Sequence, residues 1–201
     1  MYILGISGSP KASGLSTLLL DKALDGAKES GALTEKIILN DLNFKACQEC
    51  GGCDRTGVCS LDDDMRPIYE KLYKADAVVV ASPIYFGNIT AQLKAMIDRC
   101  HSSWMAKYIL KIDLLGNKKR KGIFLSVAGK DTEEYFESAK KIIKTFFITQ
   151  NIEYLSELFI SGLNSVSIDD PKIEAALEKA YRLGVNVVLD SSGSALRMTE
   201  W

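Results

Sequence analysis

Ala77-Val78-Val79-Val80-Ala81 is the stretch of this sequence that decides the fold. All five residues are apolar, so a strand formed by them would be apolar on both faces. A strand of this kind is typical of the centre of a parallel sheet, where helices cover the sheet from both sides. The segment therefore predicts an α/β architecture.

Strands and helices are predicted to alternate on both sides of this segment. Apolar runs predict four further strands, at 2–7, 33–39, 122–127 and 154–161. Helical spacing of apolar residues predicts helices at 16–28, 65–74, 90–100, 132–150 and 171–189. Five strands separated by helices predict an α/β fold with a doubly wound, five-stranded parallel sheet. Ligands bind such sheets beyond the carboxyl ends of the strands.

The domain organisation follows from this alternation and from composition. The chain has 201 residues, of which 47% are hydrophobic, and this suits one globular domain. We expect that domain to span residues 1–190, with a polar, cysteine-rich insertion at 40–64 after the second strand and a tail at 191–201. The basic run at 118–121 predicts a solvated turn before a strand.

Charge and hydropathy exclude several classes of partner. The net charge of −1 gives no electrostatic basis for binding nucleic acid. The apolar runs fall short of the ~20 residues that a membrane helix needs. The amino-terminal segment has neither the basic region nor the cleavage site of a signal peptide. We therefore expect a cytoplasmic protein that binds no membrane.

Four cysteines, Cys47, Cys50, Cys53 and Cys59, lie within thirteen residues in the spacing C-x2-C-x2-C-x5-C, and Cys100 is the only other one. In a reducing compartment such a group indicates metal or redox chemistry in preference to disulfides. Short C-x2-C-x2-C runs suit a cubic iron–sulfur cluster. A structural zinc site with four thiolate ligands, or free thiols without metal, remain open as alternatives.

The segment that follows the first strand favours phosphate binding. It reads Ser7-Gly8-Ser9-Pro10-Lys11-Ala12-Ser13-Gly14-Leu15-Ser16-Thr17 and leads into a helix. A helix amino terminus offers free backbone N–H groups and a positive dipole end, and the hydroxyls add donors. The segment is neither G-x-G-x-x-G nor a nucleotide P-loop. We expect it to bind a terminal monoester phosphate.

The segment that follows the central strand favours binding of a flat ring. It reads Ser82-Pro83-Ile84-Tyr85-Phe86-Gly87-Asn88, with two aromatic residues between Pro and Gly. Aromatic side chains can form a wall for a ring, and backbone amides can reach its polar edge. These are the requirements of a flavin site, in which the protein positions the ring and hydrogen bonds to it.

These two segments, with the following Thr90-Ala91-Gln92-Leu93-Lys94-Ala95-Met96-Ile97-Asp98-Arg99, make the chain resemble the flavodoxin-like NADPH-dependent FMN reductases. The cysteine spacing followed by Asp62-Asp63-Asp64-Met65 resembles one branch, the iron–sulfur flavoproteins of anaerobic archaea and bacteria. The resemblance covers roughly residues 2–130 and is weaker beyond them. The loop after the fourth strand is Gly-rich in that branch, whereas here Ala128 precedes Gly129.

The resemblance implies a site for each of two cofactors, FMN and a [4Fe–4S] cluster. It implies that the FMN phosphate is held by Ser7, Ser9, Lys11, Ser16 and Thr17, that the ribityl chain and ring contact Pro83, Ile84, Tyr85, Phe86, Gly87 and Asn88, and that Ala128 and Gly129 cover the far side of the ring. It also implies that Cys47, Cys50, Cys53 and Cys59 ligate the cluster.

The function that the resemblance implies is an electron-transfer oxidoreductase. A ferredoxin-like donor would supply the cluster, and FMN would reduce a small-molecule acceptor. The resemblance further implies a homo-oligomer, a dimer or tetramer, with the cluster of one subunit close to the FMN of another. Two alternatives stay open: an NAD(P)H-dependent FMN or quinone reductase without a cluster, and a zinc-stabilised flavin-binding module that acts as a sensor or interaction protein.

Some charged and aromatic residues allow only general expectations. Asp62–Asp64 predict the amino-terminal cap and first-turn charge of the next helix. Asp98 and Arg99 are compatible with a pair across a subunit contact or with a solvated helix end. Trp104 and Trp201 are compatible with covering a flavin or a neighbouring subunit.

Overall fold

A five-stranded parallel sheet forms the centre of the molecule. The computed structural model describes residues 1–114, 116, 118–131, 133–164, 167 and 169–191. The strands are β1 (Tyr2–Ser7), β2 (Leu33–Ile38), β3 (Ala77–Pro83), β4 (Arg120–Val127) and β5 (Ile152–Ile160), in the spatial order β2-β1-β3-β4-β5. All four strand pairs are parallel. The predicted fold class is confirmed. Residues 192–201 of the predicted tail, including Trp201, lie outside the described residues.

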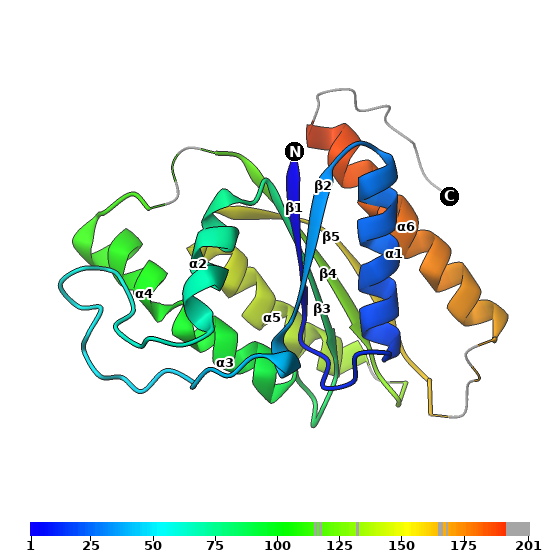
Figure 1. Cartoon of the computed structure of the whole chain (residues 1–201). Helices are drawn as coiled ribbons and strands as arrows, with labels where there is room; N and C mark the ends of the chain where they lie inside the picture. Colours follow the sequence, from blue (N-terminus) through cyan, green and yellow to red (C-terminus); the bar gives the residue numbers. More distant parts are fainter. Residues whose placement is uncertain (115, 117, 132, 165–166, 168, 192–201) are drawn as a thin grey trace.

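Helices cover both faces of the sheet, as Figure 1 shows. One face is covered by α1 (Leu15–Glu29) and α6 (Pro171–Ser191), and the other by α2 (Met65–Lys74), α3 (Ala91–Arg99) and α5 (Glu133–Thr149). The short α4 (His101–Trp104) and the π-helical η2 (Met105–Leu110) continue from α3, and the 3₁₀ turn η1 (Leu39–Asp41) follows β2. Within the described residues no helix is long and apolar enough to cross a membrane.

The central strand is β3, as the apolar stretch predicts. All its residues are buried. Because successive side chains of a strand point to opposite faces, Val78 and Val80 enter the core beneath α2, α3 and α5, whereas Val79 and Ala81 enter the core beneath α1 and α6. The two cores therefore meet at β3, which fixes this strand at the middle of the sheet.

Close packing of α1 on α6 depends on two glycines. A Cβ atom at Gly184 would lie 1.8 Å from the carbonyl oxygen of Ala23, and one at Gly26 would lie 2.2 Å from that of Tyr181. Both obstacles are backbone atoms, which cannot move aside as a flexible side chain can. The glycines therefore let the two helices approach closely.

The prediction of a solvated turn at 118–121 is wrong in its second half, because Lys118 and Lys119 are exposed before the strand, whereas Arg120 and Lys121 belong to β4. Strand β4 begins at Arg120, and the Arg120 side chain is buried. Its guanidinium donates to the carbonyl oxygens of Leu72, Ala75 and Gln150 at the ends of neighbouring elements. Burial lowers the pKa of Arg120 to about 10. Both β4 and β5 begin two residues earlier than the apolar pattern predicts.

Candidate cofactor sites

Three loops meet at the carboxyl ends of β1, β3 and β4, and hydrogen bonds tie them together (Figure 1). The Gly8 amide donates to the carbonyl oxygen of Ala81 at 2.8 Å, and the Thr90 hydroxyl donates to that of Gly8 at 2.6 Å. The Ser126 hydroxyl donates to the carbonyl oxygen of Ser82 at 2.8 Å. The predicted phosphate and ring segments are therefore neighbours, at the edge where such sheets bind ligands.

The hydroxyls of the first loop organise its backbone. Ser7 and Thr17 share a hydrogen bond of 2.9 Å between their buried hydroxyls. The Ser9 hydroxyl accepts from the Lys11 amide at 3.1 Å and lies 3.0 Å from the Lys11 carbonyl oxygen, to which it donates. Ser16 is also buried, whereas the Lys11 side chain is exposed. The hydroxyls thus hold the loop in a turn against the start of α1.

The amino terminus of α1 has no side-chain cap. Gly14 occupies the cap position with extended φ and ψ of −71° and 152°, and the first turn carries no acidic residue. Helix amino termini ordinarily gain a capping oxygen, because their first N–H groups have no partner within the helix. This uncapped end, next to a hydroxyl-rich loop, fits a phosphate group.

The second loop presents a strained, exposed aromatic residue. Tyr85 and Asn88 exchange backbone hydrogen bonds of 2.8 Å and 3.1 Å, which close a tight turn over Phe86 and Gly87. Both central residues have positive φ, 49° at Phe86 and 78° at Gly87. A left-handed conformation is costly for Phe, and its fully exposed side chain gains no packing in return. An exposed ring held in this way fits contact with a flat ligand.

We expect the substitution Phe86→Gly to weaken FMN binding at least tenfold without lowering the free energy of unfolding of the FMN-free protein. Burying an aromatic ring against a ligand contributes about 1.5–3 kcal/mol. The left-handed conformation costs Phe about 1–2 kcal/mol, which glycine would not incur. Lys111 also has a positive φ, 56°, so Lys111→Gly is a matched control. Flavin fluorescence titration and urea unfolding measure the two effects; unchanged FMN affinity would contradict the prediction.

The third loop contacts Asn164, a residue that no sequence pattern points to. The Asn164 amide donates to the carbonyl oxygen of Gly129 at 3.1 Å. A Cβ atom at Gly129 would lie 2.0 Å from the side-chain oxygen of Asn164. Gly129 therefore leaves the space that the Asn164 side chain occupies, while the adjacent Ala128 is buried. The predicted site residues from all three loops lie at this same end of the sheet.

The cysteine loop, residues 42–64, lies beside α3, α4 and η2, away from α1 and α6 (Figure 1). Residues 40–41, predicted as part of it, belong to η1. Glu49, Gly51 and Gly57 turn the loop with positive φ of 50°, 70° and 70°. A Cβ atom at Gly57 would lie 2.6 Å from that of Ala106. The loop therefore rests directly on η2.

The four cysteines of this loop surround one cavity of about 240 Å³. A single water-sized probe needs about 10–15 Å³, so the cavity has room for a group much larger than one atom. Within the described residues, no three or more His, Cys, Asp or Glu side chains are arranged to hold a single metal ion. The cavity is lined by residues 47–51, 53, 54, 59–61, 99, 101 and 102.

The thiols of this cavity differ in their electrostatic surroundings. Hydrogen bonds from the Ser60 hydroxyl and then from the Gly52 amide lower the pKa of the Cys50 thiol. Burial raises the pKa of Cys53, and the negative charges of Asp54, Cys59 and Cys47 raise it further. Three thiols are thus close enough to repel one another when ionised, an arrangement that a cationic centre would stabilise.

Arg99 and Asp63 form a buried ion pair beneath the loop. The Arg99 side chain is 1% exposed, and its two terminal nitrogens lie 2.7 Å and 3.1 Å from the Asp63 carboxylate oxygens. Burial alone would raise the pKa of Asp63, but Arg99 and the Met65 and Lys45 amides lower it overall. The solvated helix end considered for this position is therefore wrong for Arg99, which is buried. Asp98 pairs with Lys94 instead.

The expected cap at Asp62–Asp64 has a different form. Asp64 stands at the cap position without a side-chain cap hydrogen bond. The Asp63 carboxylate accepts from the Met65 amide at 3.1 Å while it binds Arg99. Sequence reasoning missed this pair because its members are 36 positions apart. The nearest available pattern was the acidic run itself, which pointed only to a helix start.

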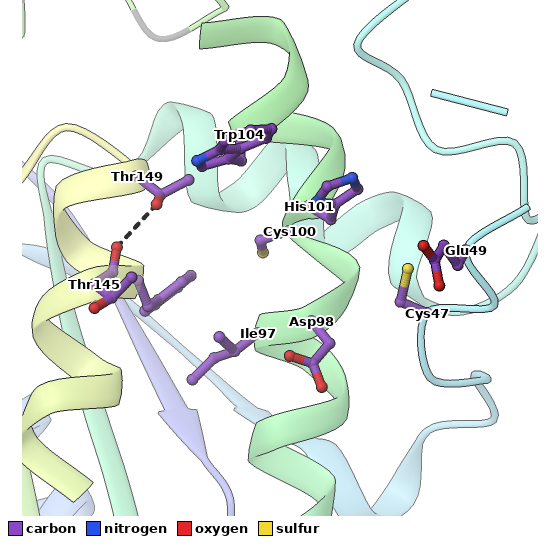
Figure 2. A pocket seen from close by; sticks show the side chains of 10 residues that line it. Cys47, Glu49, Ile97, Asp98, Cys100, His101, Trp104, Thr145 and Thr149 are labelled. Atoms are coloured by element: carbon purple, nitrogen blue, oxygen red, sulfur yellow. Dashed lines mark hydrogen bonds between the residues drawn. The ribbon is translucent and has the colours of Figure 1, made fainter. Parts of the chain in front are cut away.

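A second cavity, of about 450 Å³, adjoins the first (Figure 2). Cys47 lines both cavities. Figure 2 shows Trp104 on the helix that follows α3, and Thr145 and Thr149 on α5. The rings of His101 and Trp104 stack at 5.5 Å with an interplanar angle of 13°. Glu49 and His101 line both cavities as well, so the two cavities share part of their walls.

Comparison with known proteins places these features in a family. The model of the family described as NADPH-dependent FMN reductase matches residues 1–129. An iron–sulfur flavoprotein of Methanosarcina thermophila is 39% identical over 129 residues, which are 64% of this chain and 64% of that protein. One of Methanocaldococcus jannaschii is 42% identical over 99 residues, which are 49% of this chain and 51% of that protein. The matches thus span between half and two thirds of these relatives.

A third relative matches over more of its length. An iron–sulfur flavoprotein of Archaeoglobus fulgidus is 34% identical over 150 residues, which are 75% of this chain and 73% of that protein. Among solved structures, an NAD(P)H:quinone oxidoreductase from Methanothermobacter marburgensis has a TM-score of 0.70 at 22% identity, covering 93% of this chain and 98% of its own. An azoreductase from Bacillus anthracis has a TM-score of 0.71 at 18% identity, with 92% and 99% covered. These structures share the fold.

Proposed function

Because the chain belongs to the NADPH-dependent FMN reductase family and to its iron–sulfur flavoprotein branch, we propose that it is an FMN-dependent electron-transfer oxidoreductase. In this proposal Cys47, Cys50, Cys53 and Cys59 hold a [4Fe–4S] cluster that exchanges electrons with FMN. A ferredoxin-like protein is the donor, and a small molecule is the acceptor. FMN accepts one or two electrons and a cubic cluster carries one, so the pair can convert between one-electron and two-electron transfer.

One observation carries the proposal: the four cysteines, drawn from thirteen residues of one loop, line a single cavity of about 240 Å³. Thiolates are the ligands of iron–sulfur clusters, and successive cysteines of a short loop can reach different corners of a cube. The charges of Cys47 and Cys59 both act on the Cys53 thiol, so the three lie close enough to share a ligand. The relatives named iron–sulfur flavoproteins agree with this assignment.

The residues of the three loops supply binding and orientation for FMN. The uncapped start of α1 at Gly14 and the hydroxyls of Ser7, Ser9, Ser16 and Thr17 suit the phosphate. The turn at Phe86 and Gly87 exposes an aromatic ring that would pack on the flavin. Ala128 and Gly129, which Asn164 contacts, would lie against the opposite face of the flavin ring.

We further propose a homo-oligomer, a dimer or tetramer. In Figure 1 the cysteine loop lies outside the α2–α4 layer, whereas the flavin loops lie at the carboxyl ends of the strands. A partner subunit could bring its own flavin loops to the cysteine loop. Exposed apolar side chains near the second cavity suit such a contact, since Trp104 is 38% exposed, Ile109 54% and Ile148 61%. Sedimentation analysis of the purified protein tests this assembly.

Anaerobic purification tests the cluster assignment. We expect about four iron and four sulfide per chain, together with one FMN, and a visible spectrum that combines flavin bands with broad iron–sulfur absorption. Reduced ferredoxin should bleach both chromophores. A yellow protein without iron that NADPH reduces would support the cluster-free reductase instead. Zinc bound by the four thiols, with no turnover, would support the sensor or interaction module.

A further inference from the structure

The guanidinium of Arg99 joins both ends of the cysteine loop. One terminal nitrogen donates to the carbonyl oxygen of Lys45 at 2.8 Å and to the Asp63 carboxylate at 2.7 Å. Lys45 lies two residues before Cys47, and Asp63 lies four residues after Cys59. Asp63 also accepts from the Lys45 amide at 3.2 Å. One buried cation and one carboxylate therefore close the segment that carries all four cysteines.

The remaining nitrogen of this side chain has no hydrogen-bond partner. The Arg99 side chain is only 1% exposed, and its Nε is buried without a hydrogen-bond partner. A buried donor without a partner costs about 1–3 kcal/mol, so such groups are rare and call for a functional explanation. Arg99 is also one of the residues that line the cysteine cavity. The unpaired donor thus belongs to a side chain that borders the cluster position.

The charge of Arg99 is held in place by its neighbours. Its terminal nitrogens lie 2.7 Å and 3.1 Å from the Asp63 carboxylate oxygens, and a guanidinium stays protonated in proteins. Arg99 therefore keeps its positive charge at any physiological pH. Arg99 also lines the same cavity as the four thiols. A fixed cation consequently stands beside the thiolates.

We propose that Arg99 is a positioning residue that clamps both ends of the cysteine loop, donates its Nε–H toward the sulfur ligands in the cavity, and raises the reduction potential of the cluster. The part that concerns potential rests on the proposed function, whereas the clamp does not. A nearby positive charge favours the reduced form, because that form carries one more negative charge. Hydrogen bonds to sulfur act in the same direction.

The double variant Asp63→Asn, Arg99→Gln is chosen so that no charge is left buried alone, whereas Asp63→Asn by itself keeps a side-chain oxygen as an acceptor for the buried Arg99. Removing only Arg99 would leave Asp63 unpaired, which is strongly destabilising. The background variant is therefore Asp63→Asn, and Arg99→Gln is added to it. Arg99→Lys keeps the positive charge but cannot bind the carboxylate through two nitrogen atoms, as the bidentate guanidinium does. Arg120→Gln is the matched control, because Arg120 is equally buried and binds carbonyl oxygens elsewhere in the fold.

The clamp is tested in the metal-free protein by the rate at which iodoacetamide alkylates the four loop cysteines. We expect the rate in the Asp63→Asn, Arg99→Gln variant to exceed that of wild type at least fivefold. Arg120→Gln should remain near the wild-type rate, and Arg99→Lys should fall between. Equal rates in the double variant and wild type would overturn the clamp, whether or not the protein ever binds iron.

The effect on the cluster is tested by redox titration of the holoprotein followed by electron paramagnetic resonance. We expect the midpoint potential to be more negative in the double variant than in Asp63→Asn alone, and Arg99→Lys to stay close to wild type. Equal potentials in Asp63→Asn and in the double variant would overturn the role of Arg99 in tuning. A wild-type protein that takes up no iron would overturn both the tuning role and the proposed function, while the alkylation result would still decide the clamp.

Discussion

The Cys53→Ala variant is expected to lose nearly all of its iron and sulfide while it retains FMN in full. Cys53 is one of the two partly buried members of the four, and the charges of Cys47 and Cys59 both act on its thiol. Its removal leaves three thiolates around a cavity of about 240 Å³. A cubic cluster needs one ligand for each iron. Iron and sulfide analysis, with FMN measured after acid release, gives both numbers.

Cys100→Ala is the matched control for this variant. Cys100 is buried among apolar residues beneath α2 and α3 and does not line the cysteine cavity. Burial raises the pKa of its thiol to about 12, so Cys100 stays protonated and is unsuited to bind metal. We expect its loss to leave iron content unchanged. Full iron content in Cys53→Ala, or iron loss in both variants, would contradict the proposed ligand set.

The fold was predictable from the sequence because its signals are local. Strand β3 is apolar at every position, and this can be recognised without knowing any contact. The prediction of β4 failed at its start for the opposite reason. Arg120 belongs to a basic run that resembles a solvated turn, and only the carbonyl oxygens of Leu72, Ala75 and Gln150 make its burial favourable. Those partners are distant in sequence and leave no pattern near Arg120.

The candidate sites likewise combine contiguous motifs, which the sequence shows, with supporting residues that are distant in sequence. The cysteine spacing and the Ser- and Gly-rich loop are contiguous, so the sequence shows them directly. The parts that hold these segments in place come from elsewhere in the chain. Arg99 closes the cysteine loop, and Asn164 fills the space beside Gly129. Their residue types are ordinary for a helix end and a loop, so only the three-dimensional structure assigns them a role.

The Gly14→Asp variant is expected to lose FMN while it keeps its iron. Gly14 stands at the cap position of α1 with the extended backbone that capping residues adopt. An aspartate there would cap the free N–H groups and stabilise the FMN-free protein by about a few tenths of a kcal/mol, since glycine is itself a tolerated cap residue. The same carboxylate would repel the phosphate. Two unit charges 4 Å apart near a protein surface interact by about 4 kcal/mol, so FMN affinity should fall at least a hundredfold.

Gly14→Asn separates charge from shape in this experiment. Asparagine caps helices about as well as aspartate and has nearly the same size, but it carries no charge. A Cβ atom at this position would lie 3.0 Å from the Ser9 hydroxyl and 3.1 Å from the Lys11 carbonyl oxygen, so both variants require the same small shift. Flavin fluorescence titration should therefore show much weaker binding in Gly14→Asp than in Gly14→Asn. Equal affinities would mean that the phosphate does not lie at the start of α1, because only the charge distinguishes the two side chains there.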